Sequence, residues 1–250
     1  MTLEVVLHSS GSYRFLPAIT AYSAGFAASD GYEITSLRLL DCPTLSIGLE
    51  KIDQEIRKRG LPASALAGLQ LRSPGAFGLE AFGKFNDEYR QLLNDRGLII
   101  DGVNPISRTN VIPIHQKPAA PSIAVAFIVH PSQGHGGSDF VVAGAAEISG
   151  DLGPENIIAR GDSSQEGLSL KVDCVLDIML ERLGALEASD ESPTTINVYT
   201  AHEILGLSEK IEMKLPSTSR NGFTIWITKP PVEELEFEMD CSSYSNWAVI

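Results

Sequence analysis

A helix followed directly by a buried strand is predicted by residues 49–73, LEKIDQEIRKRGLPASALAGLQLRS. Its apolar side chains return every three or four residues on one helical face: Leu45, Leu49, Ile52 and Ile56. Gly60 ends the helix, and residues 65–71 then form an apolar run of strand length. The same succession returns in residues 172–200, VDCVLDIMLERLGALEASDESPTTINVYT. A repeated helix and strand of this kind predicts an α+β fold with an internal duplication.

The flanking segments extend this repeat in both directions. In the first half we expect strands near residues 4–7, 33–40, 65–71, 109–114 and 122–129, with a second helix over residues 79–95. In the second half we expect strands near residues 140–146, 195–200, 222–228 and 234–239, with a long helix over residues 168–183. The second helix of the first half is expected to be cut down in the second half, to residues 203–215.

The boundary between the two copies is expected at the loop-like stretch PSQGHGGS, residues 131–138. We therefore expect one unit over residues 1–130 and a second over residues 131–250. The turn before a late strand also repeats, as NPISRTNVI (residues 104–112) and PSTSRNGFTI (residues 216–225). The last ten residues, CSSYSNWAVI, are expected to be a loosely held C-terminal tail.

The charge of the chain limits its partners. Its formal net charge is -13, and no run of Lys or Arg builds a local basic face, so DNA and RNA are not expected partners. A carboxylate substrate would need a local Arg against this acidic background. No basic leader is present, and no apolar run approaches the ~20 residues of a membrane span, so we expect a cytoplasmic protein without membrane contact.

Familiar catalytic motifs are missing from the sequence. It has no phosphate-binding loop in a strand-to-helix context, no GxSxG nucleophile elbow and no metal-ligand spacing of His residues. We therefore expect a reaction that needs no side-chain nucleophile, metal or cofactor. Three segments of the first half carry the remaining polar pattern: PAITAYSAGF (residues 17–26), FNDEYRQLL (residues 85–93) and NPISRTNVI.

This pattern resembles the reactive-intermediate imine deaminase (RidA) family. Family members carry a P-x-I-x-x-Y-S segment, an F-x-x-x-N-x-x-Y-x-x-F helix, a P-x-R-[ST] turn before a strand, and a final E-x-E strand. Five residues of the first half fall on these positions in order: Tyr22, Ser23, Asn86, Tyr89 and Arg108. The resemblance covers most of the chain and is closest to tandem members of the 2-aminomuconate deaminase type.

The second half matches the family at other positions. VVAGAAEISGD (residues 141–151) is similar to a family strand and turn, Arg220 falls at the Arg position, and LEFEMD (residues 235–240) is similar to the E-x-E strand. The resemblance implies two fused RidA-like (chorismate-mutase-like) units, each a mixed β-sheet packed on one face by helices. It also implies a homo-oligomer, a trimer with clefts at its interfaces.

The activity implied is hydrolysis of the imine or enamine form of a small carboxylate. Arg108 is expected to hold the carboxylate, because a guanidinium offers two parallel donors. Tyr22 and Glu236 are expected to orient the attacking water. Substrate-binding roles are expected for four further residues: Arg72, Asn86, Arg220 and Ser23. Of these, Arg72 would suit the second carboxylate of an aminomuconate-type dicarboxylate.

Neither copy is complete by itself. The first half ends in SIAVAFIV without the two Glu residues, and the second half lacks a clear Tyr-Ser segment. Either the clefts combine residues of both copies, or one kind of cleft is inactive. Two other functions stay open: a ligand-binding or stress-protective protein without turnover, and an isomerase or cyclase that uses the same cleft. Each named residue also admits an ordinary structural role.

Overall fold

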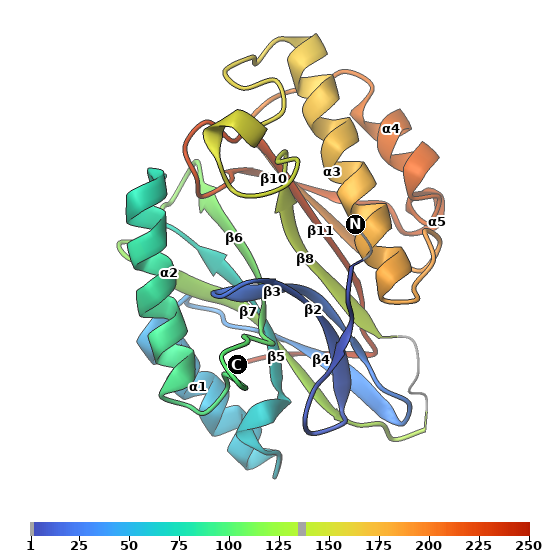
Figure 1. Cartoon of the computed structure of the whole chain (residues 1–250). Helices are drawn as coiled ribbons and strands as arrows, with labels where there is room; N and C mark the ends of the chain where they lie inside the picture. Colours follow the sequence, from blue (N-terminus) through green and yellow to red (C-terminus); the bar gives the residue numbers. More distant parts are fainter. Residues whose placement is uncertain (1–2, 135–138) are drawn as a thin grey trace.

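The computed structural model describes residues 3–134 and 139–250, and Figure 1 shows the whole chain. The first half contains β1 (Val6–Leu7), β2 (Tyr13–Ile19), β3 (Tyr22–Ala28), β4 (Tyr32–Arg38), α1 (Leu45–Lys58), β5 (Leu66–Arg72), α2 (Leu79–Asn94), β6 (Ser107–Pro113) and β7 (Ser122–Pro131). The second half contains β8 (Phe140–Ala146), α3 (Gln165–Ala185), β9 (Thr195–Thr200), α4 (Leu207–Lys214), α5 (Thr218–Asn221), β10 (Thr224–Lys229), β11 (Phe237–Ser243) and β12 (Asn246–Val249). Short 3-10 turns occupy Ala63–Ala65 and Pro154–Asn156.

The strands show the duplication directly. All twelve belong to one sheet, in the order β1-β2-β3-β8-β11-β9-β10-β6-β5-β7-β4-β12. Within it, β4-β7-β5-β6 and β8-β11-β9-β10 are the same motif: two antiparallel pairings followed by one parallel pairing. The α+β class and the two-copy architecture expected from the sequence are therefore confirmed. The shortened second helix of the second copy is α4, followed by the single turn α5.

Helices cover each motif on its outer face. In Figure 1, α1 and α2 lie together over one part of the sheet, and α3, α4 and α5 lie over the other. Apolar side chains of α1 and α2 pack on β4, β5 and β7, whereas α3 and α4 pack on β8, β9 and β11. A third cluster of buried residues joins β2, β3, β4 and β7 and contains Tyr13, Phe26 and Phe127. Across the described residues, no helix has both the length and the apolar character that crossing a membrane requires.

Strand pairings hold the two halves together. The N-terminal strand β3 pairs with β8 of the second half, and β10 pairs with β6. A single parallel pairing, Ser23 with Ser107, also joins β3 to β6. The predicted loose tail is wrong: β11 runs to Ser243, and β12 pairs in parallel with β4. Asp139 fastens this tail because its carboxylate accepts hydrogen bonds from the backbone N–H and the hydroxyl of Ser245. Residues 135–138 of the expected linker lie outside the described residues.

Candidate active site

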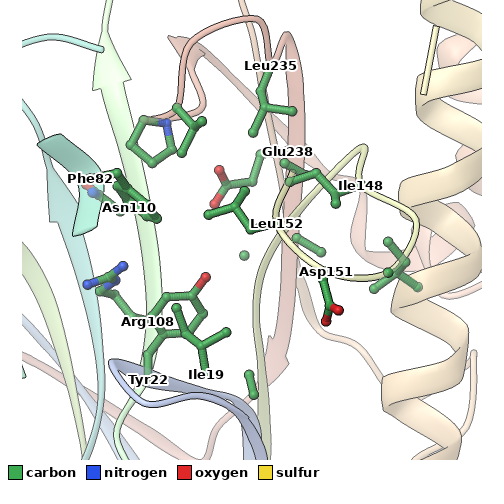
Figure 2. Close-up of a pocket in the computed structure, with 18 of the residues that line it drawn as sticks. Ile19, Tyr22, Phe82, Arg108, Asn110, Ile148, Asp151, Leu152, Leu235 and Glu238 are labelled. Carbon is green, nitrogen blue, oxygen red and sulfur yellow. The ribbon is translucent and has the colours of Figure 1, made fainter. Parts of the chain in front are cut away.

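A cavity of ≈ 300 Å³ lies between the two halves of the chain. Its walls come from β3, α2 and β6 of the first half and from β8, α3 and β11 of the second half. Figure 2 shows the side chains of Arg108, Tyr22 and Glu238 directed toward the same open space. The cavity therefore combines residues of both copies within one chain, which is one of the two arrangements that the incomplete copies left open.

Strand geometry brings Arg108 and Tyr22 to one place. Ser23 pairs with Ser107 across β3 and β6, and side chains alternate between the two faces of a strand. Tyr22 and Arg108 flank this pair, so both point to the opposite face, toward the cavity. The guanidinium of Arg108 lies over the ring of Tyr22, with its central carbon 4.3 Å from the ring centroid.

Three aromatic rings of α2 complete the surroundings of this guanidinium. Its central carbon is 4.8 Å from the ring centroid of Tyr89, 5.3 Å from that of Phe85 and 5.6 Å from that of Phe82. The faces of aromatic rings carry a partial negative charge and attract a cation, but they do not neutralise the charge of the cation. The aromatic residues of α2 thus hold the charged group in a largely apolar setting.

Arg108 has unused hydrogen-bonding capacity. Its Nη2 donates to Oδ1 of Asn86 at 2.7 Å, whereas its buried Nη1 has no hydrogen-bond partner among the described residues. Burial lowers the pKa of Arg108, although a guanidinium stays protonated in proteins. No carboxylate of the described residues lies within ion-pair distance of it. A buried cation with an unpartnered N–H group is suited to an anionic ligand.

Glu238 faces Arg108 across the cavity and supplies an ionisable acid. Burial raises the pKa of its carboxyl to about 8, and the nearby charges of Asp240 and Glu147 act in the same direction. The group therefore carries a proton at neutral pH and can give it up. Gly144 of β8 lies against this carboxyl, because a Cβ at that position would overlap it. Because residue 144 has no side chain, there is room for the carboxyl of Glu238 in the cavity.

Asp240, two residues further along β11, is held by four donors. Its carboxylate accepts from the side chains of Gln70 (3.0 Å), Thr109 (2.9 Å), Asn197 (2.8 Å) and Tyr199 (2.8 Å). The hydroxyl of Thr109 also accepts from the backbone N–H of Gly144 at 2.9 Å. This buried network connects β5, β6, β8, β9 and β11, and so fixes the strands that carry Arg108 and Glu238 relative to each other.

A buried ion pair determines where β11 begins. Glu147 and Lys171 are both fully buried and approach to 3.2 Å. The carboxylate of Glu147 also accepts from the backbone N–H groups of Glu236 (2.6 Å) and Phe237 (3.1 Å). These bonds hold the backbone just before Glu238 in place.

Three of the predicted site residues come together: Tyr22 and Arg108 line the cavity, and Asn86 accepts a hydrogen bond from Arg108 without lining it. Ser23 does not line it. Its buried hydroxyl donates to the carbonyl of Pro105 at 2.9 Å, which helps to hold β3 beside the segment that leads into β6. Ser23 therefore supports the position of its neighbour Tyr22.

Glu236 lies outside the cavity, which corrects its expected position. Its carboxylate binds Lys229 and His202, each at 2.7 Å. Although partial burial raises the pKa of Glu236, hydrogen bonds from these two residues bring it below its ordinary value. Of the two glutamates in the E-x-E segment, Glu238 lines the cavity. Glu236 precedes β11, which starts at Phe237.

The two other predicted arginines also lie elsewhere. Arg72 sits with its guanidinium 5.9 Å from the ring of Trp226 and donates to the carbonyl of Leu71. Arg220 is exposed on α5, where it donates to the carbonyl of Glu191. The corresponding strand β10, TIWITK, has no Arg, so the second copy lacks an equivalent of Arg108. The SR dipeptides of the two halves are not equivalent, because Ser219 and Arg220 lie within α5 and Ser107 and Arg108 begin β6.

The sequence interpretation missed one cationic residue of the cavity, Arg182. It lies in the last turn of α3, and its Nη1 donates to the carbonyl of Ala143 at 3.0 Å. An Arg next to the buried stripe of Met179 and Leu183 was the available signal. Within the described part of the chain, no group of three or more His, Cys, Asp or Glu side chains could hold a metal ion.

The fold and this cavity define a class of protein: two fused α+β units that build one cavity between them. A solved chorismatase shares the fold, with a TM-score of 0.50 at 11% identity, covering 96% of this chain and 79% of the other. The YjgF gene product of E. coli aligns with a TM-score of 0.29 at 9% identity, over 46% of this chain and 91% of its own.

Sequence comparison identifies the family. Residues 5–246 match the family model described as 2-aminomuconate deaminase CnbZ. A protein of Comamonas testosteroni named 2-amino-5-chloromuconate deaminase is 35% identical over 240 residues, which is 95% of each chain. The chain belongs to the CnbZ 2-aminomuconate deaminase family, and the resemblance to tandem members of that type is confirmed.

Proposed function

We propose that the protein is a deaminase that hydrolyses the imine or enamine form of an aminomuconate-type carboxylate in the cavity between its two halves. The observation that carries this proposal is the placement of Arg108 opposite Glu238: a buried guanidinium whose Nη1 has no partner among the described residues faces a buried carboxyl whose pKa is about 8. The family membership supports the substrate class, since the similar proteins are named for aminomuconate and aminochloromuconate.

The arginine supplies binding and orientation. Arg108 holds the carboxylate next to the reacting carbon, with its Nη1 donating and Asn86 fixing Nη2. The aromatic rings around it exclude water, which strengthens this contact. Because imines hydrolyse readily in water, placing the substrate and one water molecule is a large part of the required catalysis.

Glu238 supplies the proton transfers. In its protonated form it gives a proton to the enamine carbon, which produces the protonated imine. The resulting carboxylate then takes a proton from water while the water oxygen bonds to the imine carbon. Collapse of this adduct breaks the carbon–nitrogen bond, releases ammonia and leaves a carbonyl. A pKa near the working pH suits a group that must both give and take a proton. Tyr22, which touches Arg108, is placed to orient the water.

Ammonia release tests the proposal. The wild type is given an enzymatically generated 2-aminomuconate, and ammonia is measured against the uncatalysed rate. We expect turnover by the wild type, and a loss of at least a hundredfold in Glu238→Gln, in line with the ~10²–10⁴-fold contribution of general acid–base catalysis. Arg220→Met, an exposed change outside the cavity, is the control and keeps full activity. Tight substrate binding without ammonia release would replace the proposal with the ligand-binding alternative.

A further inference from the structure

Two guanidinium groups line the same cavity, one from each copy. Arg108 comes from β6 and Arg182 from the last turn of α3. Among the described residues, neither has a carboxylate within ion-pair distance. Buried or half-buried arginines normally have such a partner, because an unpaired charge is costly to remove from water. Two of them at one cavity call for an explanation beyond packing.

The acidic side chains of the cavity do not neutralise this charge. Its two acidic lining residues are Glu238 and Asp151. The raised pKa of Glu238 keeps that carboxyl protonated at neutral pH, and Asp151 is exposed on a loop. The cavity lining therefore holds two positive charges, the buried Arg108 and the half-buried Arg182, and no buried negative charge. The complementary ligand is a dianion.

The guanidinium of Arg182 is held by a hydrogen bond to the backbone and still has N–H groups that can bind a ligand. Its Nη1 donates to the carbonyl of Ala143, which fixes the group beside β8. A guanidinium carries five N–H groups, and neither Nε nor Nη2 of Arg182 donates to another described residue. Both Arg182 and Arg108 are close enough to Tyr22 and Glu238 to interact with them electrostatically. The two cations thus border one ligand-sized space from different walls.

We propose that Arg182 binds the second carboxylate of a linear dicarboxylate whose reacting end is held by Arg108, and so sets a preference for dicarboxylates over monocarboxylates. This inference rests on the proposed function and specifies its substrate class. Arg182 takes the role that the sequence suggested for Arg72, whose guanidinium lies over Trp226 instead. Arg182 is a specificity-determining residue, because it acts on the end of the substrate that does not react.

Equilibrium binding of two unreactive probes tests the proposal by calorimetry. Muconate is a six-carbon diene with a carboxylate at each end, and sorbate is the same chain with one carboxylate. We expect the wild type to bind muconate at least tenfold more tightly than sorbate. In Arg182→Met, muconate should weaken by roughly ten- to a hundredfold and sorbate by less than threefold, as expected for loss of one charge-assisted hydrogen-bonded contact.

A matched control separates binding from structure. Arg14 on β2 also donates to a backbone carbonyl, that of Leu186 at 2.7 Å, and lies outside the cavity. Arg14→Met removes the same charge and should leave both affinities unchanged. If Arg182 only holds β8 in place, Arg182→Met weakens both probes alike, and the proposal is overturned. Equal affinity of the wild type for muconate and sorbate overturns it as well, even if the variant does not fold.

The two proposals fail in different ways. Muconate and sorbate carry no nitrogen, so their binding does not depend on turnover. A wild type that prefers muconate but releases no ammonia from 2-aminomuconate contradicts the deaminase proposal alone. A wild type that releases ammonia but does not distinguish the two probes contradicts the role of Arg182 alone.

Discussion

Replacing Glu238 with Gln is expected to stabilise the protein, and to do so more strongly as the pH rises. The folded protein keeps this buried carboxyl protonated up to about pH 8, whereas the unfolded chain ionises it near pH 4.5. Between these values the unfolded state binds fewer protons, so the free energy of unfolding falls with increasing pH. Glutamine has nearly the shape of the protonated acid but cannot ionise, and so it removes this effect.

The magnitude follows from the two pKa values. Since a tenfold change in proton affinity is worth about 1.4 kcal/mol, the carboxyl opposes folding by about 3 kcal/mol at pH 7 and by about 5 kcal/mol above pH 8. We therefore expect Glu238→Gln to exceed the wild type in stability by about 1 kcal/mol at pH 5.5, with the difference growing to these values at higher pH. These are upper limits, because the fold can relax around an ionised group.

Urea unfolding at pH 5.5, 7 and 8.5 measures the difference. Glu236→Gln is the matched control on the same segment. Its carboxylate is bound by Lys229 and His202, which hold its pKa below the ordinary value, so removing it should lower stability at neutral pH. Opposite signs for the two variants are predicted. A stability difference for Glu238→Gln that does not change with pH would refute the reasoning, because the carboxyl would then be ionised in the folded protein.

Three further outcomes are expected. Arg108→Lys should lower kcat/KM by roughly 30- to 150-fold, because an ammonium cannot offer parallel donors to a carboxylate while bonding Asn86. An equal kcat/KM for the variant and the wild type would contradict the role of Arg108 in holding the carboxylate. Gly144→Ala should abolish turnover while leaving the fold intact by circular dichroism, because its Cβ displaces the carboxyl of Glu238; full activity would show that the acid is not needed there. The exposed apolar strand β10, whose Trp226 is 37% exposed, favours self-association. Light scattering should give the trimer that the family resemblance implies, and a stable monomer would contradict it.

The repeated helix and strand were visible in the sequence because they follow from local periodicity. The apolar stripe of α1 and the run that became β5 needed no knowledge of the partner strands. The pairing of β12 with β4 was not visible, because it depends on a contact between the two ends of the sequence. A short, isolated strand of four residues carries too little pattern to reveal such a partner.

The motif residues Tyr22, Asn86 and Arg108 lie together because strand pairing and helix packing bring their segments to one place, but their roles stay predictions. Glu236 lies outside the cavity because it precedes β11, which begins at Phe237 and not at the expected residue 234, and its carboxylate binds Lys229 and His202. Arg182 could not have been assigned from α3 alone. Its position at the cavity depends on how α3 packs against β8, which the sequence of the helix does not reveal.

The most direct test of the account is a crystal structure of the protein with muconate bound. We expect one carboxylate of muconate within hydrogen-bond distance of the unpartnered Nη1 of Arg108, in the cavity beside Glu238. Muconate bound elsewhere, with Arg108 still without an anionic partner at saturating ligand, would contradict the claim that this guanidinium holds the substrate.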